Sequence, residues 1–323
     1  MKATVFRSLN EAKLRFEPSA LAIGNFDGVH VGHQALIERT IAAAADKSLK
    51  SAVLTFYPHP TAIVAPHRTP DLITTLEERL RLLDSSGVQQ IMVLPFTPEI
   101  AGTNPREFVS QILVDALKTQ VVLVGENFRF GHKQAGTPEL LRSLGGEFGF
   151  ESQFLSPVTV RGEIASSSAV RKHLASGNVS RAARLLNRCF FVEGPVVSGH
   201  GIGSRQTVPT LNLKPAPGQS LPRGVYVTET FELSGGRRWP SITNAGVRPT
   251  FHGEELTIET YLLAPLDGET PDRIQVHFRH FLREERQFPD PGALKAQILR
   301  DVARAQTYWR RTARLSNLRS SIY

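Results

Sequence analysis

The first half of the chain alternates short, continuous apolar segments with helical patterns. The apolar segments predict strands at 20–23, 52–56, 91–94 and 121–124, with a fifth around Phe154 and Leu155. The intervening patterns predict helices at 35–45, 76–83, 105–117 and 138–144. Strands that are apolar on both faces and joined by helices are typical of a parallel sheet covered on both sides. The pattern therefore predicts a doubly wound α/β domain, in which ligands bind beyond the carboxyl ends of the strands.

The second half of the chain no longer alternates strand and helix patterns. Two short helices are expected at 168–175 and 179–186. Strand-like segments separated by Gly and Pro clusters then follow at 190–197, 224–231, 242–246, 257–263 and 274–278. Because no helices lie between them, an antiparallel sheet or small β-barrel is expected, closed by a C-terminal helix over 292–308. We expect two domains, 1–186 and 187–323.

The composition argues against a membrane-spanning, secreted or disulfide-bonded protein. No run of about 18 apolar residues suggests a membrane span, and the N-terminal segment lacks the apolar core of a secretory signal. Cys189 is the only cysteine, which excludes an intramolecular disulfide. These features predict a cytoplasmic protein without a membrane partner.

The net charge of +8 raises the question of an acidic partner. A basic balance suits nucleic acid, an acidic membrane surface or small phosphorylated ligands. Basic residues are densest near the C-terminus, at Arg300, Arg304, Arg310, Arg311, Arg314 and Arg319. A solvated basic helix explains this patch, and no RNA-recognition or zinc-finger signature is present, so no nucleic-acid partner is expected. The sequence leaves the oligomeric state open.

The segment from Gly24 to His33, GNFDGVHVGH, lies between the first predicted strand and the first predicted helix. Its glycines permit tight turns and a close approach of the backbone to a ligand. The helix that follows offers unpaired N–H groups and the positive end of its dipole, and His30 and His33 add imidazole donors there. The segment is neither a Walker A loop nor a dinucleotide-binding G-x-G-x-x-G. It contains no obvious nucleophile, so it suits attack by the substrate itself on a nucleotide phosphate.

Simpler interpretations of this segment stay open at this point. A Gly-rich turn is often only a turn, and two histidines three residues apart also occur as a metal site or as surface residues. The position of His30 and His33 between a buried strand and a helix favours phosphate binding over both.

Several segments together resemble one family. GNFDGVHVGH is similar to the H-x-G-H signature of the α/β nucleotidyltransferase superfamily, and more narrowly to bacterial bifunctional riboflavin kinase/FAD synthetases. VGENFRFG at 124–131, with Gly136 beyond it, resembles that family's second nucleotide motif. SSSAVR at 166–171 resembles its Ser-Ser-Thr-x-x-Arg motif, with Ser168 in the usual Thr position. Segments at 95–97 and 105–109 are also similar. Together with the segments of the second half described below, the resemblance covers nearly the whole chain.

The resemblance implies that the N-terminal domain transfers AMP from ATP to FMN, giving FAD and pyrophosphate. His30 and His33 would then be catalytic residues that contact the phosphates of ATP. The implied ATP-binding residues are Gly24, Asn25, Phe26, Asp27, His30, His33, Asn127, Ser167, Ser168 and Arg171. A guanidinium at a helix start suits phosphate, which supports Arg171 independently. For Asp27 we favour a structural role in the turn over a role in holding magnesium.

A second motif, VPTLN at 208–212, follows a Gly-rich stretch and resembles the Pro-Thr-x-Asn motif of riboflavin kinases. The resemblance implies that Thr210 and Asn212 provide oxygen ligands to Mg²⁺ beside ATP, and that Gly203 lies in the ATP-binding loop. Two segments of the second half differ from the usual pattern of this family. Thr207-Val208 stand where the family commonly has Gly-Phe, and the loop at 264–272 replaces its usual turn.

Glu259 lies on a predicted strand where alternation directs Ile258 to the opposite face. The resemblance implies that Glu259 is the kinase base, which accepts the proton of the 5′-hydroxyl of riboflavin as that oxygen attacks the γ-phosphate of ATP. Segments at 244–251 and 281–288 also resemble the family and are interpreted as barrel and flavin-site framework, with Arg283 a weaker candidate contact.

The expected ligands are riboflavin, FMN, FAD and ATP as co-substrate, with Mg²⁺ as cofactor. Three alternatives stay open. One activity alone could be retained, the kinase being the one that the departures would impair. The chain could be a nucleotidyltransferase for another phosphorylated small molecule. A basic RNA-binding protein with an accessory barrel would instead show salt-sensitive RNA affinity and no turnover of ATP.

Overall fold

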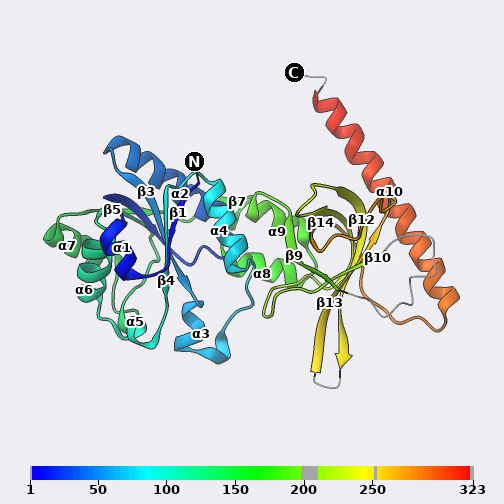
Figure 1. The fold of residues 1–323 in the computed structure, drawn as a ribbon, viewed down its shortest axis with the longest axis horizontal. Coiled ribbons are helices and arrows are strands. Elements are labelled where there is room, and N and C mark those ends of the chain that lie inside the picture. Colours follow the sequence, from blue (N-terminus) through cyan, green and yellow to red (C-terminus); the bar gives the residue numbers. More distant parts are fainter. Residues whose placement is uncertain (1, 198–209, 251–252, 321–323) are drawn as a thin grey trace. The chain divides into compact units, whose positions relative to one another are not determined.

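The computed structural model describes residues 2–197, 210–250 and 253–320, and the chain divides into two compact units, Met1–Ser167 and Ser168–Tyr323 (Figure 1). Helices α8 (Ser167–Ala175) and α9 (Val179–Leu186) therefore group with the second unit. The division of activities at 186/187 stays a prediction. In the described parts of the chain, we find no helix that combines the length and the apolar character needed to cross a membrane.

The first unit is built around a six-stranded parallel sheet (Figure 1). Its strands are β1 (Thr4–Phe6), β2 (Ser19–Ile23), β3 (Lys50–Tyr57), β4 (Gln90–Pro95), β5 (Thr119–Gly125) and β6 (Glu151–Leu155). Its helices are α1 (Leu9–Arg15), α2 (Val31–Asp46), α3 (Pro60–Val64), α4 (Leu76–Ser85), α5 (Pro98–Gly102), α6 (Pro105–Glu107) and α7 (Pro138–Phe148). Three further helical segments are η1 (Pro66–Arg68), η2 (Phe108–Ala116) and η3 (His132–Gln134), and a small hairpin pairs β7 (Thr159–Val160) with β8 (Glu163–Ile164).

Strand β2 shows why the sheet is covered on both faces. All five of its residues are buried. Leu21 and Ile23 join the core cluster that includes residues of α1, η2 and α7, whereas Ala20 and Ala22 join the cluster that includes residues of α2 and α4. Successive side chains of a strand point to opposite faces, so a strand buried in two cores reads as one continuous apolar run. The predicted doubly wound α/β architecture is confirmed.

The strand order places a topological switch point between β2 and β5. The sheet runs β1-β4-β3-β2-β5-β6, and all neighbouring strands are parallel. From β2 the chain passes outward through β3 and β4, then returns to place β5 on the other side of β2. Loops leave in opposite directions at such a point and open a crevice at the carboxyl edge of the sheet, where ligands bind.

Several local features differ from the expectation, and α3, α5 and the β7–β8 hairpin are among the elements that were not predicted. Strand β1 was not predicted because a three-residue strand carries no readable periodicity. The seven-residue helix α1 was not predicted either. The helix predicted over 105–117 forms, but its main part, η2, is a π-helix. Helix α2 begins at Val31 and not near Ala35, which places His33 inside its first turn.

The second unit is a closed six-stranded antiparallel barrel with strand order β10-β13-β12-β11-β14-β9. Its strands are β9 (Phe190–Val197), β10 (Thr210–Leu213), β11 (Gly224–Glu232), β12 (Arg238–Thr250), β13 (Gly253–Leu262) and β14 (Arg273–Arg283). Helix α10 (Pro291–Ser320) follows and is longer than predicted. Its residues Val302, Ala305, Tyr308 and Trp309 cluster with outward-facing barrel residues, among them Val225 and Ile242. The predicted small barrel with a C-terminal helix is confirmed.

Candidate active sites

The turn after β2 occupies the switch point and holds an unusual backbone. Phe26, Gly28 and Val29 all have positive φ, at 50°, 79° and 41°. This region is open to glycine but costs energy for other residues, especially a β-branched valine. Phe26 and Val29 are buried, so packing holds the turn in this shape. Strained backbone of this kind clusters at functional sites.

Asp27 fixes the turn against the segment that leads into α4. Its carboxylate is buried and accepts hydrogen bonds from the backbone N–H groups of Ile73 and Thr74 at 3.0–3.1 Å, and from the Thr74 hydroxyl at 3.1 Å. The buried guanidinium of Arg79 lies 3.9 Å away. These contacts are those of a structural anchor, the role that the sequence favoured for Asp27.

The two histidines lie together at the start of α2. His30 is the N-cap residue, and its Nδ1 accepts a hydrogen bond of 3.4 Å from the backbone N–H of His33. Since Nδ1 is an acceptor, the neutral ring carries its proton on Nε2, where it can be donated to a ligand. The two rings stack, with 3.7 Å between centroids and 21° between planes. The structure therefore brings both predicted imidazoles to the positive end of the helix dipole.

The environment of His33 favours its neutral form. Burial, together with the charges of His30 and Arg79, holds the pKa of His33 well below its usual range. Its Nδ1 is buried and meets no hydrogen-bond partner among the described residues. His33 is therefore a neutral imidazole at neutral pH.

Ser167 joins the same turn from a distant part of the chain. Its hydroxyl donates a hydrogen bond of 2.9 Å to the backbone carbonyl of Asp27. A side chain at Gly32 would press on the ring of His30 and approach the carbonyl of Ala165, so glycine allows these segments to meet closely. Ser168 and Arg171 follow on α8, in the second unit, with Ser168 exposed and Arg171 half-buried.

The other predicted ATP-binding residues lie around the carboxyl edge of the sheet. Gly24 directly follows β2, and its N–H donates to the carbonyl of Leu54. The carbonyl of Asn25 accepts from the Thr55 hydroxyl at 3.0 Å. Asn127 is exposed in the turn that follows β5, the neighbour of β2.

His59 was not predicted as a site residue from the sequence. It is the N-cap of α3, and its Nε2 lies 3.3 Å from the side-chain amide of Asn25. The available signal was its position in YPHP, directly after β3, because parallel strands end at the same edge of the sheet. His59 is thus a third imidazole beside the β2 turn.

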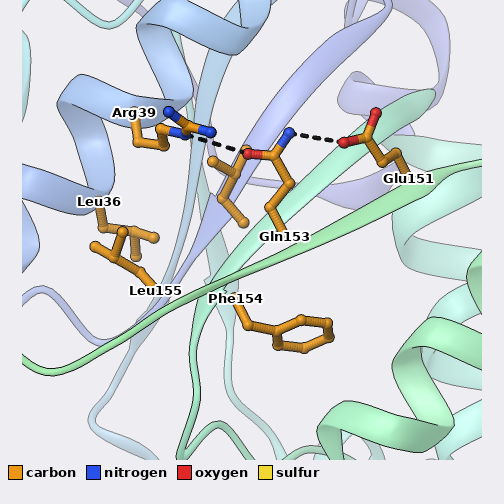
Figure 2. Close-up of a pocket in the computed structure, with 7 residues that line it drawn as sticks. Leu36, Arg39, Glu151, Gln153, Phe154 and Leu155 are labelled. Carbon is orange, nitrogen blue, oxygen red and sulfur yellow. Dashed lines mark hydrogen bonds between the residues drawn. The ribbon is translucent and has the colours of Figure 1, made fainter.

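A pocket of about 420 Å³ lies elsewhere on this unit, between α2 and the edge strand β6. It is lined by Leu36, Arg39, Leu123, Glu151, Gln153, Phe154 and Leu155. Figure 2 shows Arg39 and Glu151 on either side of Gln153, joined through it by hydrogen bonds of 3.4 and 2.8 Å. None of the predicted site residues lines this pocket.

The barrel brings three predicted kinase residues together through strand register. Asn212 of β10 pairs directly with Glu259 of β13, and Thr210 pairs with Tyr261. Leu211, Ile258 and Thr260 are buried, whereas Asn212 and Glu259 are half-buried and Thr210 is exposed. The alternation places Thr210, Asn212 and Glu259 on the outer face of the barrel wall.

The donor set on this face fits a magnesium ion. The Thr210 hydroxyl and the Asn212 carbonyl are oxygen ligands two residues apart on one face of a strand. Mg²⁺ prefers oxygen ligands and keeps several waters or phosphate oxygens, so two protein ligands suffice. The predicted ATP-loop residue Gly203, together with the departure at Thr207-Val208, lies outside the described residues.

Arg283 is held by other residues of the second unit. Its Nε lies 2.9 Å from the buried carboxylate of Asp301 on α10, and its Nη1 donates to the carbonyl of Glu284 at 3.0 Å. The guanidinium also lies over the ring of Phe288. These contacts tie the end of β14 to α10.

Two groups of polar residues, one at the turn after β2 and one on the outer face of the barrel, accompany this fold. Together they define a class: a two-domain transferase with an α/β nucleotidyltransferase-type domain and a β-barrel. The sequence model of the FAD synthetase family matches residues 13–169, and that of the riboflavin kinase family matches 186–309. The bifunctional riboflavin kinase/FMN adenylyltransferase of Escherichia coli K12 is 35% identical over 293 residues, covering 91% of this chain and 93% of the relative. The chain belongs to the family of bifunctional riboflavin kinase/FMN adenylyltransferases.

Two further relatives span nearly the same length. The bifunctional riboflavin kinase/FMN adenylyltransferase of Pseudomonas fluorescens is 33% identical over 302 residues, covering 93% of this chain and 96% of the relative. A crystal structure described as a macrolide-efflux protein from Streptococcus pneumoniae is 26% identical, with a TM-score of 0.84, and covers 94% of this chain and 98% of that one.

Proposed function

We propose that this chain makes FAD from riboflavin in two ATP-dependent steps at two separate sites, divided near residues 186 and 187. The barrel phosphorylates riboflavin to FMN, and the α/β domain transfers AMP from ATP to FMN. The observation that supports this most is that both family models match one chain in order, the first over the α/β domain and the second over the β-barrel.

In the adenylyl transfer, a phosphate oxygen of FMN attacks the α-phosphorus of ATP. The bond from that phosphorus to the β-phosphate bridging oxygen breaks, and pyrophosphate leaves. The N–H groups at the start of α2 and the Nε2–H of His30 donate to phosphate oxygens on which charge develops. Neutral His33 supports the ring of His30 by stacking and adds a donor without adding charge. The roles of Asn127, Ser168 and Arg171 rest on the family resemblance.

In the kinase step, the 5′-hydroxyl oxygen of riboflavin attacks the γ-phosphorus of ATP, and ADP leaves. Glu259 accepts the hydroxyl proton. Thr210 and Asn212 would hold Mg²⁺, which supplies positive charge that screens the phosphates when bound. The pairing of Asn212 with Glu259 supports this assignment, because it sets the metal ligand beside the base on one face.

One experiment tests both steps. The purified chain is incubated with riboflavin, ATP and Mg²⁺, and the flavins are resolved by chromatography. We expect FMN to appear first and FAD to follow. The absence of both products would contradict the proposal, and FMN without FAD would confine activity to the barrel.

Control reactions separate the rival functions. Release of pyrophosphate that depends on a different phosphorylated acceptor, with FMN inert, would favour another nucleotidyl transfer. Salt-sensitive RNA binding without ATP turnover would favour the RNA-binding alternative. Neither proposed reaction requires nucleic acid or a second chain. The need for ATP supports a cytoplasmic location, which cell fractionation would test.

A further inference from the structure

A polar residue that the proposed mechanism does not use lies beside Glu259. Asn244 of β12 pairs directly with Glu259 of β13, so Glu259 has Asn244 on one side and Asn212 on the other. Thr243 and Ala245 are buried, whereas Asn244 is half-buried, so alternation places Asn244 on the same outer face as Glu259. Directly opposed residues of an antiparallel pair have Cβ atoms about 4.5–5.5 Å apart.

Glu285 determines how the amide of Asn244 is oriented. The Nδ2 of Asn244 donates a hydrogen bond of 3.1 Å to Oε1 of Glu285. An ionised carboxylate only accepts hydrogen bonds, so the amide must turn its NH₂ group toward Glu285. Glu285 reaches this position because residue 246 is glycine. A Cβ atom at Gly246 would overlap the Glu285 carboxylate.

The orientation leaves the carbonyl oxygen of Asn244 in need of a donor. Oδ1 is buried and has no hydrogen-bond partner among the described residues. A buried acceptor without a donor is uncommon in folded proteins, and it is readily explained when a ligand supplies the donor. The polyol side chain of riboflavin offers hydroxyl donors next to the one that Glu259 deprotonates.

We propose that Asn244 and Glu285 form a substrate-orienting pair in the kinase site, an inference that rests on the proposed kinase function of the barrel. Oδ1 of Asn244 accepts a hydrogen bond from a hydroxyl of the substrate's polyol chain that does not react. Glu285 is a positioning residue that keeps the amide in the required orientation. The pair thereby aligns the 5′-hydroxyl with Glu259.

The test measures steady-state riboflavin phosphorylation by the full chain carrying Asn244→Leu, Glu285→Gln or Gly246→Ala. We expect KM for riboflavin to rise about tenfold in Asn244→Leu, the size of one lost hydrogen bond, with KM for ATP and the Mg²⁺ requirement unchanged. Glu285→Gln and Gly246→Ala should raise it by less, because they release the amide without removing it. Lys295→Gln, at an exposed position of α10 outside both of these segments, is the control and should behave as the wild type.

Analogues of riboflavin that lack one unreactive ribityl hydroxyl separate substrate contact from general damage to the barrel. The wild type should discriminate against one of these analogues, and Asn244→Leu should lose that discrimination. A variant that keeps the wild-type preference for every hydroxyl would overturn the proposal, as would a changed Mg²⁺ requirement with an unchanged KM for riboflavin. If the wild type itself formed no FMN, the proposed kinase function would fail first, which is a distinguishable outcome.

Discussion

The rings of His30 and His33 stack face to face at the first turn of α2, with 3.7 Å between their centroids. His30 caps the helix, while His33 is held neutral by burial and by the charges around it. Two adjacent imidazolium ions would repel each other, and the neutral state of His33 avoids that repulsion. This pairing predicts unequal roles for the two histidines.

Replacing His30 with alanine should lower FAD formation from supplied FMN by about 100-fold or more, the range observed when one preorganised donor is removed from a transition state. FMN formation from riboflavin should be unchanged, because the barrel carries that reaction in our proposal. Chromatographic assay of both products, starting separately from riboflavin and from FMN, measures the two effects. Equal loss of both activities would contradict the assignment of His30 to one site.

The stability of the protein should fall as the pH drops below about 6.5, the ordinary histidine pKa. The pKa of His33 is lowered by burial and neighbouring charges, and burial lowers the pKa of His277 to about 4. The unfolded chain binds a proton at each histidine before the folded chain does, so acid favours unfolding. Each residue should cost up to about 1.4 kcal/mol per pH unit between that point and its folded-state pKa.

Urea unfolding at several pH values measures this effect, with probes that report each unit separately because a two-unit chain need not unfold in one step. His33→Gln should flatten the pH dependence of the first unit only, and His277→Gln that of the second only. A pH dependence of the first unit that is the same with and without His33 would show that other groups cause it.

Asp27→Asn should destabilise the first unit by about 3 kcal/mol. The substitution places an NH₂ group among backbone N–H donors and removes a negative charge 3.9 Å from the buried Arg79 guanidinium. Adenylyl transfer should fall as well, because the turn that carries His30 loses its anchor. Asp46→Asn, on the exposed last turn of α2, is the matched control in an unfolding measurement and should change stability little. A fully stable but inactive Asp27→Asn protein would instead favour a direct role of Asp27 toward ligands.

The features predicted correctly from the sequence are those that depend only on residues close together along the chain. Strand β2, the Gly-rich turn and α2 are consecutive, so periodicity and glycine spacing were enough to place His30 and His33 at a helix start. The contacts of Asp27 with Thr74, and of Asn25 with His59, join segments that no local pattern connects. They depend on which strands become neighbours, a property of the whole sheet.

The kinase cluster shows the same limit. Alternation along β13 correctly separated Ile258 from Glu259, but the pairing of Glu259 with Asn212 and Asn244 depends on barrel register. Register is set by core packing and turn geometry across several strands, so a single segment does not reveal it. The role of Asn244 therefore emerged only from the closed barrel.

Asn212→Ala should raise the Mg²⁺ concentration needed for half-maximal FMN formation by roughly tenfold, the effect of losing one polar contact to a charged group. Glu259→Gln should instead lower the rate at saturating Mg²⁺, because it removes the proton acceptor and no metal ligand. Magnesium titrations of riboflavin phosphorylation distinguish the two, with Thr257→Ala on the same face of β13 as a control. The Mg²⁺ dependence of FAD formation from supplied FMN should be unaffected by all three changes. If Asn212→Ala and Glu259→Gln altered the same kinetic parameter, Asn212 would act through the base, and the metal would have to bind elsewhere.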